Sequence, residues 1–263
     1  MQRLVTLTTD FGLHDYFAGT MKGVILNINP TAQIVDISHA VQSFDVLDGA
    51  LTIAAAYSYF APGTIHVVVV DPGVGTSRRP IVAGTASYLF VAPDNGVLSF
   101  VFEWEERVTV RQITDQSIFL QPVSATFQGR DIFAPVAGHL SKGRDSATLG
   151  EIVGDYVRLP LPRPRRMGNS VVGVVLRVDK FGNLVTNIRP GDAPQLFQPG
   201  QGFRLMAGNG VIRSLRHAFA EGAPGEAFAI LGSMGFLEIA ANRGSAAELL
   251  GAGEGAEVNL ALE

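Results

Sequence analysis

The sequence contains no cysteine, which excludes disulfide frameworks, thiolate zinc sites and cysteine nucleophiles. Formal charge is also sparse, because only 17% of the residues are charged and the net charge is −4. Nucleic-acid-binding proteins usually carry a basic excess or a basic stripe. The only dense basic cluster here, Arg163, Arg165 and Arg166, is interleaved with prolines and is more typical of a linker. We therefore expect no nucleic-acid partner.

The sequence also lacks a long hydrophobic run suited to a membrane span. The longest stretch without formal charge covers residues 49–70, and Pro62 and Gly63 interrupt it. The first twelve residues do not show the charged-then-apolar pattern of a signal peptide. We therefore expect a cytoplasmic protein with no membrane partner. Hydrophobic residues make up 47% of the chain, which is ample material for a buried core.

Several common catalytic patterns are missing as well. No GxSxG pentapeptide occurs, which argues against a serine hydrolase with a nucleophile elbow. The five histidines show neither HxH nor HExxH spacing, so we expect no metal site. The DPGVGT segment at residues 71–76 lacks the Lys-Ser/Thr ending of a phosphate-binding loop.

The first half of the chain alternates short β-type runs with helical segments. Residues 65–70 read IHVVVV, which is typical of a strand buried on both faces. This alternation predicts an α/β N-terminal domain with a mainly parallel central sheet flanked by helices. The expected strands are Leu4–Thr8, Ile34–Ile37, Ile65–Val70, Pro80–Ala83, Tyr88–Val91 and Val108–Ile113, and the expected helices are Tyr16–Ile28, Val46–Tyr59 and Asp131–Ser141.

The pattern changes after a segment that is dense in proline and arginine. We place a Pro/Arg-rich linker at residues 159–170, between an N-terminal domain at 1–158 and a C-terminal domain at 171–263. Beyond the linker, short β-type runs alternate with glycine-rich turns. This pattern predicts a small all-β antiparallel C-terminal domain that resembles a barrel.

The most informative residues follow the expected strands of the first half. Ligands of open α/β sheets bind beyond the carboxyl ends of the strands. A single aspartate-glycine pair at such a place is ordinarily a turn or a helix cap. Four loops of this kind in one sheet favour a ligand site instead, and the loops are TTDFG at 8–12, DPGVG at 71–75, APDNG at 92–96 and TFQGRD at 126–131. An unpaired carboxylate is costly in the mostly buried setting of Asp10, and two neighbouring ribose hydroxyls are a natural partner for it.

The second half contains one segment of similar character, DKFGN at residues 179–183. It reads as a β-hairpin turn. It also ends in Asn183, whose amide offers both a donor and an acceptor, as recognition of a purine edge requires.

Five motifs in this order resemble one family. They are TTDFG with Asp15, DPGVGT with Arg78, APDNG, TFxGRDIFAP and VDxFGNLVTN. Together they are similar to the S-adenosylmethionine (SAM) hydroxide adenosyltransferases, or SAM hydrolases, which are related to the SAM-dependent chlorinases and fluorinases. The resemblance covers nearly the whole chain. It implies an α/β N-terminal domain, a β C-terminal domain and a homotrimer in which SAM lies between domains of neighbouring subunits.

The resemblance also implies roles for individual residues. Asp10 would hold the ribose hydroxyls, and Asn183 would read the adenine. Asp15, Asp179 and Ser233 would face the amine and carboxylate of the methionine part. Phe44 and Phe181 would form apolar walls, and Asn95 and Phe127 complete the substrate-binding set. SAM would be the substrate, adenosine and methionine the products, and no cofactor would be needed.

The expected catalytic residues are Asp71, Arg78 and Gln128. In the hydroxide-using relatives an Asp-Arg-His set handles the water, and this chain has Gln128 where those enzymes have histidine. Glutamine can bind a water but cannot accept its proton. General-base assistance is worth ~10²–10⁴-fold, so Gln128 predicts slow turnover if the histidine acts as a base.

Three candidate functions follow from this resemblance, and they are given in order of preference. The first is hydrolysis of SAM to adenosine and L-methionine by attack of water or hydroxide at the ribose C5′. The second is binding of SAM or adenosine with little or no turnover, because of Gln128. The third is a SAM-dependent halogenase. Two features argue against it: the Asp71 carboxylate would repel a halide, and the segment 77–91 leaves no room for the insertion of the fluorinases.

Overall fold

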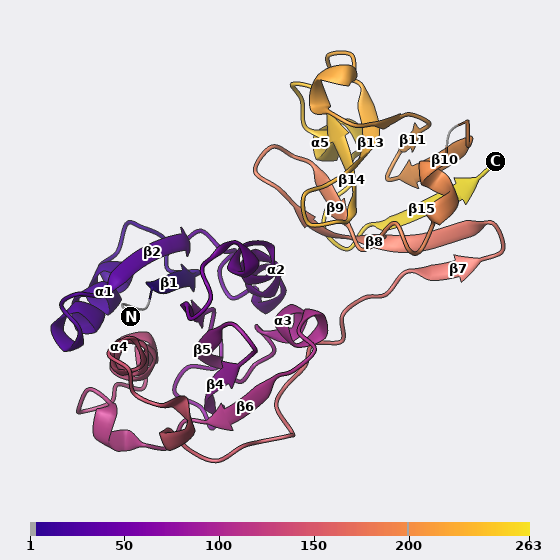
Figure 1. Ribbon diagram of the computed structural model, residues 1–263. Helices are drawn as coiled ribbons and strands as arrows, with labels where there is room; N and C mark the ends of the chain where they lie inside the picture. Colours follow the sequence, from indigo (N-terminus) through magenta and orange to yellow (C-terminus); the bar gives the residue numbers. More distant parts are fainter. Residues whose placement is uncertain (1–3, 199) are drawn as a thin grey trace. The chain divides into compact units, whose positions relative to one another are not determined.

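The computed structural model describes residues 4–198 and 200–263. The chain divides into two compact units, the first ending at Pro160 and the second covering Leu161–Glu263 (Figure 1). Each unit has its own hydrophobic core. Among the described residues, no helix is long and apolar enough to cross a bilayer.

A six-stranded sheet forms the centre of the first unit. The strands lie in the order β2-β1-β3-β5-β4-β6. The first four are parallel to one another, whereas β4 is antiparallel to both β5 and β6, so the sheet is mixed. The strands are β1 (Leu4–Thr9), β2 (Gln33–Ser38), β3 (Ile65–Val69), β4 (Pro80–Gly84), β5 (Leu89–Pro93) and β6 (Thr109–Gln112).

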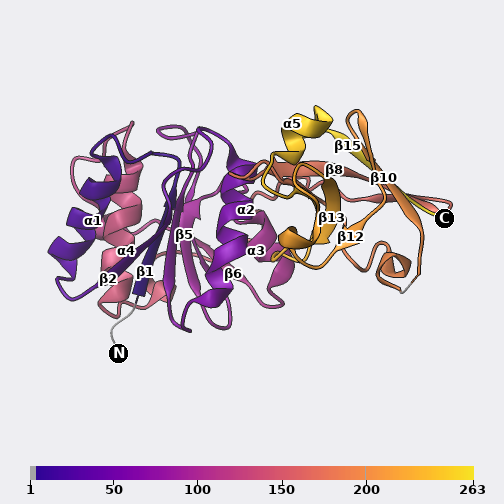
Figure 2. The ribbon, with the colours of Figure 1, turned by 90° about the horizontal axis from the view of Figure 1, so that it is seen from above.

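Helices cover both faces of this sheet. Helices α1 (Phe17–Ile28) and α4 (Ala134–Ser141) pack together on one face, and α2 (Val46–Ala56) and α3 (Ser99–Trp104) lie on the other (Figure 2). Along β3 the side chains alternate between the two cores, with Val67 and Val69 in one and Val68 in the other. The expectation of a strand buried on both faces is therefore confirmed.

The second unit is built from one curled sheet. The strand order is β11-β10-β15-β8-β9-β14-β13-β12, and β7 pairs with β8. All neighbours are antiparallel except β12 and β13. Leu205 of β10 and Ile239 of β14 belong to the same core although their strands are far apart in the sheet. The strands are β7 (Arg165–Met167), β8 (Ser170–Val178), β9 (Leu184–Thr186), β10 (Phe203–Ala207), β11 (Gly210–Ile212), β12 (Leu215–Arg216), β13 (Ala227–Leu231), β14 (Leu237–Ala241) and β15 (Glu257–Leu262).

The structure differs from the sequence expectation in its short elements. The second unit is not entirely β, because α5 (Ala246–Leu250) begins after the capping side chain of Ser245 and ends at the left-handed Gly251. Five residues are too few to show a helical period. Helix α3 was not expected either, because its six residues, SFVFEW, are also too few to show a helical period. Strand β7 lies within the segment expected to be a linker.

Single-turn elements complete the fold. They are 3₁₀ helices at Tyr57–Tyr59, Gln116–Ile118, Ser146–Thr148, Pro194–Phe197 and Phe219–Glu221, and a π-helical turn at Gly129–Phe133 that runs directly into α4.

Candidate active site

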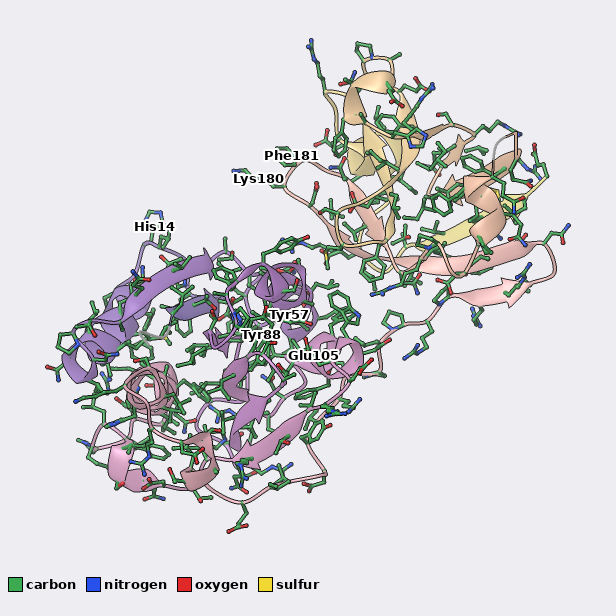
Figure 3. All side chains as sticks on the ribbon, viewed as in Figure 1. His14, Tyr57, Tyr88, Glu105, Lys180 and Phe181 are labelled. Atoms are coloured by element: carbon green, nitrogen blue, oxygen red, sulfur yellow. The ribbon has the colours of Figure 1, made fainter. Side chains whose placement is uncertain are left out.

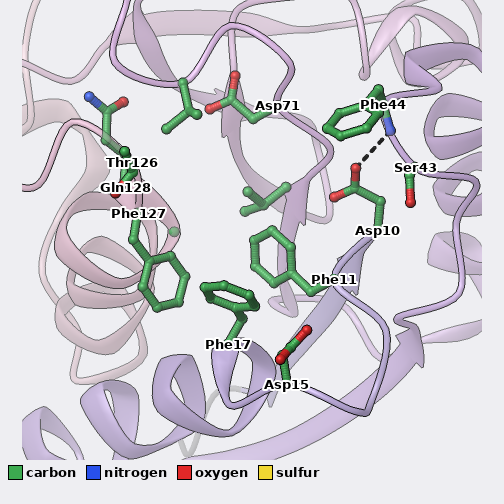
Figure 4. A pocket seen from close by; sticks show the side chains of 13 residues that line it. Asp10, Phe11, Asp15, Phe17, Ser43, Phe44, Asp71, Thr126, Phe127 and Gln128 are labelled. Carbon is green, nitrogen blue, oxygen red and sulfur yellow. Dashed lines mark hydrogen bonds between the residues drawn. The ribbon is translucent and has the colours of Figure 1, made fainter.

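A cavity of about 400 Å³ opens in the first unit beyond the carboxyl ends of β1 and β3 (Figure 4). Asp10 follows β1 and Asp71 follows β3, and these strands are parallel neighbours, so their ends meet at the same edge. Three carboxylates and several aromatic rings share this space. The cavity is lined by Asp10, Phe11, Asp15, Phe17, Ser43, Phe44, Val69, Asp71, Val74, Thr126, Phe127, Gln128 and Gly129.

Asp10 is bound to a distant loop. The backbone N–H of Phe44 donates to Asp10 Oδ2 at 2.9 Å (Figure 4). Phe44 has a φ of 68°, in the left-handed region that costs a non-glycine residue about 1–2 kcal/mol. Its side chain is held open to solvent. The structure shows no hydrogen bond between Asp10 Oδ1 and any described residue, so this oxygen is available to a ligand.

One wall of the cavity is aromatic. The ring of Phe127 lies 5.0 Å from that of Phe17 and 6.0 Å from that of Phe11, each in an edge-to-face arrangement. Such contacts stabilise the wall beyond the burial of its area. Phe44 and Phe127 were expected from the sequence, whereas Phe11 and Phe17 were not. In the sequence, Phe11 directly follows Asp10 and Phe17 lies two residues after Asp15, and these positions are the only signal for them.

A polar cluster of Asp71, Arg78 and Gln128 forms the opposite side. Arg78 Nε donates to both oxygens of Asp71 at 2.9 and 3.0 Å, and Arg78 Nη2 contacts Asp71 Oδ2 and Gln128 Oε1. Only 9% of the Arg78 side chain and 5% of the Asp71 side chain are exposed. Arginine has no acceptor, so Gln128 must turn its oxygen toward Arg78. Its NH₂ group is then left to donate to a molecule in the cavity.

A close approach at a glycine holds this cluster together. Gly75 has a φ of 78°, and a Cβ there would lie 2.3 Å from the carbonyl oxygen of Ala125. Only glycine therefore lets the DPGVG loop approach the loop that carries Gln128. Gln128 itself caps the π-helical turn, and such turns are frequent at functional sites.

The remaining acid of the TFQGRD motif has a structural role. Asp131 is fully buried, accepts from the backbone N–H of Ser124 at 2.7 Å and pairs with Arg130 at 2.6 Å. It fixes the loop before the π-helical turn and does not line the cavity.

Asn95 is not part of this cavity. Its Nδ2 donates to the carbonyl oxygen of Val70 at 2.8 Å, and its Oδ1 accepts from the N–H of Val97 at 3.1 Å. The amide thus fixes the turn after β5. The structure brings Asp10, Asp15, Phe44, Asp71, Phe127 and Gln128 together at the cavity, with Arg78 bonded to two of them, and leaves Asn95 outside.

The second unit has a hollow of its own, of about 610 Å³. It is lined by Phe181, Asn183, Phe219, Ala241, Arg243 and Gly244. Phe181 is 75% exposed and stands at the tip of its loop (Figure 3), whereas Asn183 is buried. Phe219 and Arg243 were not expected from the sequence.

Asp179 holds the turn that carries Phe181 and Asn183. Its Oδ1 accepts from the N–H groups of Phe181 and Asn183 at 2.8 and 2.9 Å, and its Oδ2 accepts from Asn183 Nδ2 at 2.8 Å. The hairpin interpretation of DKFGN therefore describes the local geometry. In the side-chain amide of Asn183, Oδ1 and one N–H make no hydrogen bond to any described residue and are available to a ligand.

The turn between β13 and β14 carries Ser233, which is exposed and does not line this hollow. Strand β14, which follows this turn, carries Glu238, a residue not expected from the sequence. Burial, together with the negative charge of Asp179, raises the pKa of Glu238 to about 7. A glutamate inside the strand LEIAA gives no sign of this in the sequence.

The comparisons with known proteins decide the family. Residues 5–150 match the SAM hydroxide adenosyltransferase N-terminal domain, and residues 173–259 match the corresponding C-terminal domain. The chain belongs to the SAM hydroxide adenosyltransferase family. The family resemblance of the five motifs is thereby confirmed.

Members of this family and its relatives match over most of their length. A protein of Salinispora tropica named (R)-S-adenosyl-L-methionine hydrolase is 38% identical, over 94% of this chain and 93% of its own. A fluorinase of Actinoplanes sp. is 28% identical, over 91% of each chain. The crystal structure of an uncharacterized conserved protein from Thermotoga maritima superposes with a TM-score of 0.92 at 39% identity, over 98% of this chain and 99% of that one.

Proposed function

We propose that the protein hydrolyses SAM to adenosine and L-methionine. The observation that carries this proposal is the buried Asp71–Arg78–Gln128 cluster, which shares a cavity with the Asp10 carboxylate. The name of the Salinispora tropica relative supports it, because that protein is a SAM hydrolase with 38% identity.

The reaction is an in-line displacement at the ribose C5′. A water oxygen bonds to C5′, the C5′–S bond breaks, and the sulfur keeps the electron pair as methionine leaves. One proton of the water is released. Because the sulfonium is already an activated leaving group, the protein mainly positions the two reactants and limits bulk water. For this reason we propose that no cofactor is needed.

The polar cluster would position the water and stabilise its developing charge. The Gln128 NH₂ donates to the water oxygen, and the Arg78 guanidinium stabilises hydroxide-like charge without acting as a base. Asp71 is bound to Arg78 through both oxygens and is the carboxylate nearest to this chemistry. It therefore orients Arg78 and is the group that can receive the released proton.

The other residues would bind the substrate. Asp10 Oδ1 is free to accept from a ribose hydroxyl, and the aromatic wall is suited to the apolar parts of SAM. In the second unit, Asn183 and the rings of Phe181 and Phe219 form a hollow suited to a purine. Asp15, Asp179 and Ser233 keep their expected role toward the methionine part as a prediction, and Asn95 would act only through the turn that it fixes.

The test is the release of adenosine and methionine from SAM, compared between the wild type and Gln128→His. We expect slow adenosine formation by the wild type and a kcat increase of about 10- to 100-fold for Gln128→His, because a base is worth at least this much. Gln116→His is the matched control, since Gln116 is exposed and lies outside the cavity. The hydrolase proposal is wrong if SAM binds tightly and neither the wild type nor Gln128→His forms adenosine.

We further propose that the protein works as a homotrimer in which the two pockets that bind one SAM belong to different subunits. The mass measured by light scattering tests the assembly. Mixed trimers of a subunit with Asp10→Ala and a subunit with Asn183→Ala test the shared site, because only the mixture would regain activity. The cytoplasmic location and the limits 1–158, 159–170 and 171–263 stay predictions.

A further inference from the structure

A buried threonine ends the strand that leads to Asp10. Thr9 is fully buried, and its Oγ1 lies 2.7 Å from Nδ1 of His39, which follows β2. The N–H of Phe11 donates to the same Oγ1 at 3.2 Å, and the N–H of Gly12 donates to the carbonyl oxygen of His39 at 2.7 Å. His39 therefore contacts the Asp10 loop through both its ring and its backbone.

The far side of the His39 ring faces Asp36. His39 Nε2 lies 3.1 Å from Asp36 Oδ1, and Lys22 Nζ donates to Asp36 Oδ2 at 2.6 Å. Partial burial raises the pKa of Asp36, but the hydrogen bonds from Lys22 and His39 outweigh it and lower the pKa overall. Asp36 is thus a charged partner for the ring.

These contacts form one chain of polar side chains. Thr9 Oγ1 accepts from the Phe11 N–H and shares a hydrogen bond with His39 Nδ1, while His39 Nε2 faces Asp36. The ring of His39 therefore links the Asp10 loop to α1 through Asp36 and Lys22.

A second threonine–histidine pair on the same strand serves as a natural comparison. Thr6 Oγ1 lies 2.7 Å from Nδ1 of His66, and both residues are fully buried. His66 lies inside β3 and packs against Tyr57, Tyr88 and Phe90. The chemistry and burial match the Thr9–His39 pair, but this pair contacts no loop of the cavity.

We propose that His39 is a positioning residue of the SAM site, which fixes the backbone from Asp10 to Gly12 and thereby holds the Asp10 carboxylate in place for the ribose. The proposal rests on the proposed function of Asp10. His39 acts on the substrate only through the loop that it holds, so its loss should affect substrate binding more than the chemical step.

The experiment compares two matched pairs of variants. Thr9→Val and Thr6→Val each remove one buried hydroxyl at nearly constant shape, and His39→Leu and His66→Leu each remove one buried ring. We expect Thr9→Val and His39→Leu to raise KM for SAM about tenfold with kcat changed less than about threefold. Thr6→Val and His66→Leu should lower the Tm by a similar amount and leave KM unchanged.

His39→Asn is the conservative variant. Its side-chain amide can reach the place of the imidazole Nδ1 and offers the Thr9 hydroxyl both a donor and an acceptor, so KM should return to within about threefold of the wild type. The proposal is overturned if Thr9→Val leaves KM unchanged, if the Thr6 and His66 variants raise KM as much, or if His39→Asn binds SAM as poorly as His39→Leu. If His39→Leu does not fold, the Thr9→Val and Thr6→Val pair decides the matter.

A binding measurement separates this inference from the hydrolase proposal. The Kd of adenosine, measured by calorimetry, reports on Asp10 without turnover. If neither the wild type nor Gln128→His forms adenosine from SAM, the hydrolase proposal fails, but a tenfold weaker Kd in Thr9→Val and not in Thr6→Val still supports the positioning role of His39. An equal Kd in the two variants overturns it.

Discussion

Two loops of this protein look alike in sequence and work differently. In both, an aspartate at a strand end is followed by phenylalanine and glycine, as DFG at 10–12 and as DKFG at 179–182. Asp10 accepts from Phe44, 34 residues away, and keeps one oxygen for a ligand. Among the described residues, the Asp179 carboxylate accepts only from residues two and four positions further on. The first carboxylate therefore joins two loops around a cavity, whereas the second shapes its own turn.

The role of a turn aspartate is therefore decided by which residue donates to its carboxylate, more than by the shape of the turn. A carboxylate satisfied by its own loop stabilises structure locally. A carboxylate that bonds to a distant loop depends on the whole fold for its position, as expected of a preorganised binding group.

The largest effect is expected for Asp10→Ala. We expect kcat/KM to fall about 100-fold, because hydrogen bonds to a charged group contribute about 1.5–3 kcal/mol each. Adenosine formation measures this. Asp115→Ala is the control, since Asp115 caps a short helix through Ser117 and lies outside the cavity. A similar loss in both variants would remove the distinction between a binding and a local aspartate.

Gly75→Ala should have the next largest effect. The substitution places a methyl group against the carbonyl oxygen of Ala125, which is backbone and cannot rotate away. We expect the DPGVG loop to move and activity to fall about 30-fold. Gly63→Ala is the matched control, because Gly63 has a φ of 88° but no atom within 4 Å of the added Cβ. Comparable losses of activity would show that backbone strain alone is responsible.

Asp179 can be tested with two substitutions that separate shape from charge. Asp179→Ala removes three hydrogen bonds of the turn and should lower the free energy of unfolding by about 2 kcal/mol in urea titrations. Asp179→Asn keeps an acceptor oxygen for the two backbone N–H groups and should cost less than about 1 kcal/mol. If Asp179→Asn nevertheless raises KM for SAM, the charge also serves the methionine part.

The smallest effect concerns Glu238 and pH. Its pKa is about 7 in the fold against an ordinary 4.5, so its contribution to stability is full at low pH and is lost as pH rises through about 7. Glu238→Gln removes this dependence. As the pH rises from 5 to 8, the wild type should lose about 1 kcal/mol of stability that Glu238→Gln does not lose, after allowance for solvent screening. A constant difference in Tm across this range would contradict the prediction.

The sequence predicted the parts of the site that follow from strand ends. IHVVVV identified a buried strand, and the acids that follow β1 and β3 meet because parallel neighbouring strands end at one edge. The sequence did not predict which way a side chain turns after the strand. Asn95 follows β5 just as Asp71 follows β3, yet its amide is bonded to the backbone of Val70 and Val97.

Other features depend on long-range packing and leave no local pattern. The orientation of the Gln128 amide is set by Arg78, fifty residues earlier in the chain. The raised pKa of Glu238 comes from burial and from the charge of Asp179, a residue 59 positions earlier in the chain. The reversed direction of β4 follows from its short hairpin to β5, which the expectation of a mainly parallel sheet did not take into account.

The two threonine–histidine pairs on β1 also constrain the pairing of the strands. Thr6 and Thr9 are an odd number of residues apart, so they project to opposite faces of the sheet. A slip of β1 by two residues would preserve its alternation of apolar and polar faces, but it would separate Thr6 from His66 and Thr9 from His39 at the same time. The register of β1 against both of its neighbours is therefore fixed by two buried hydroxyls as well as by the backbone.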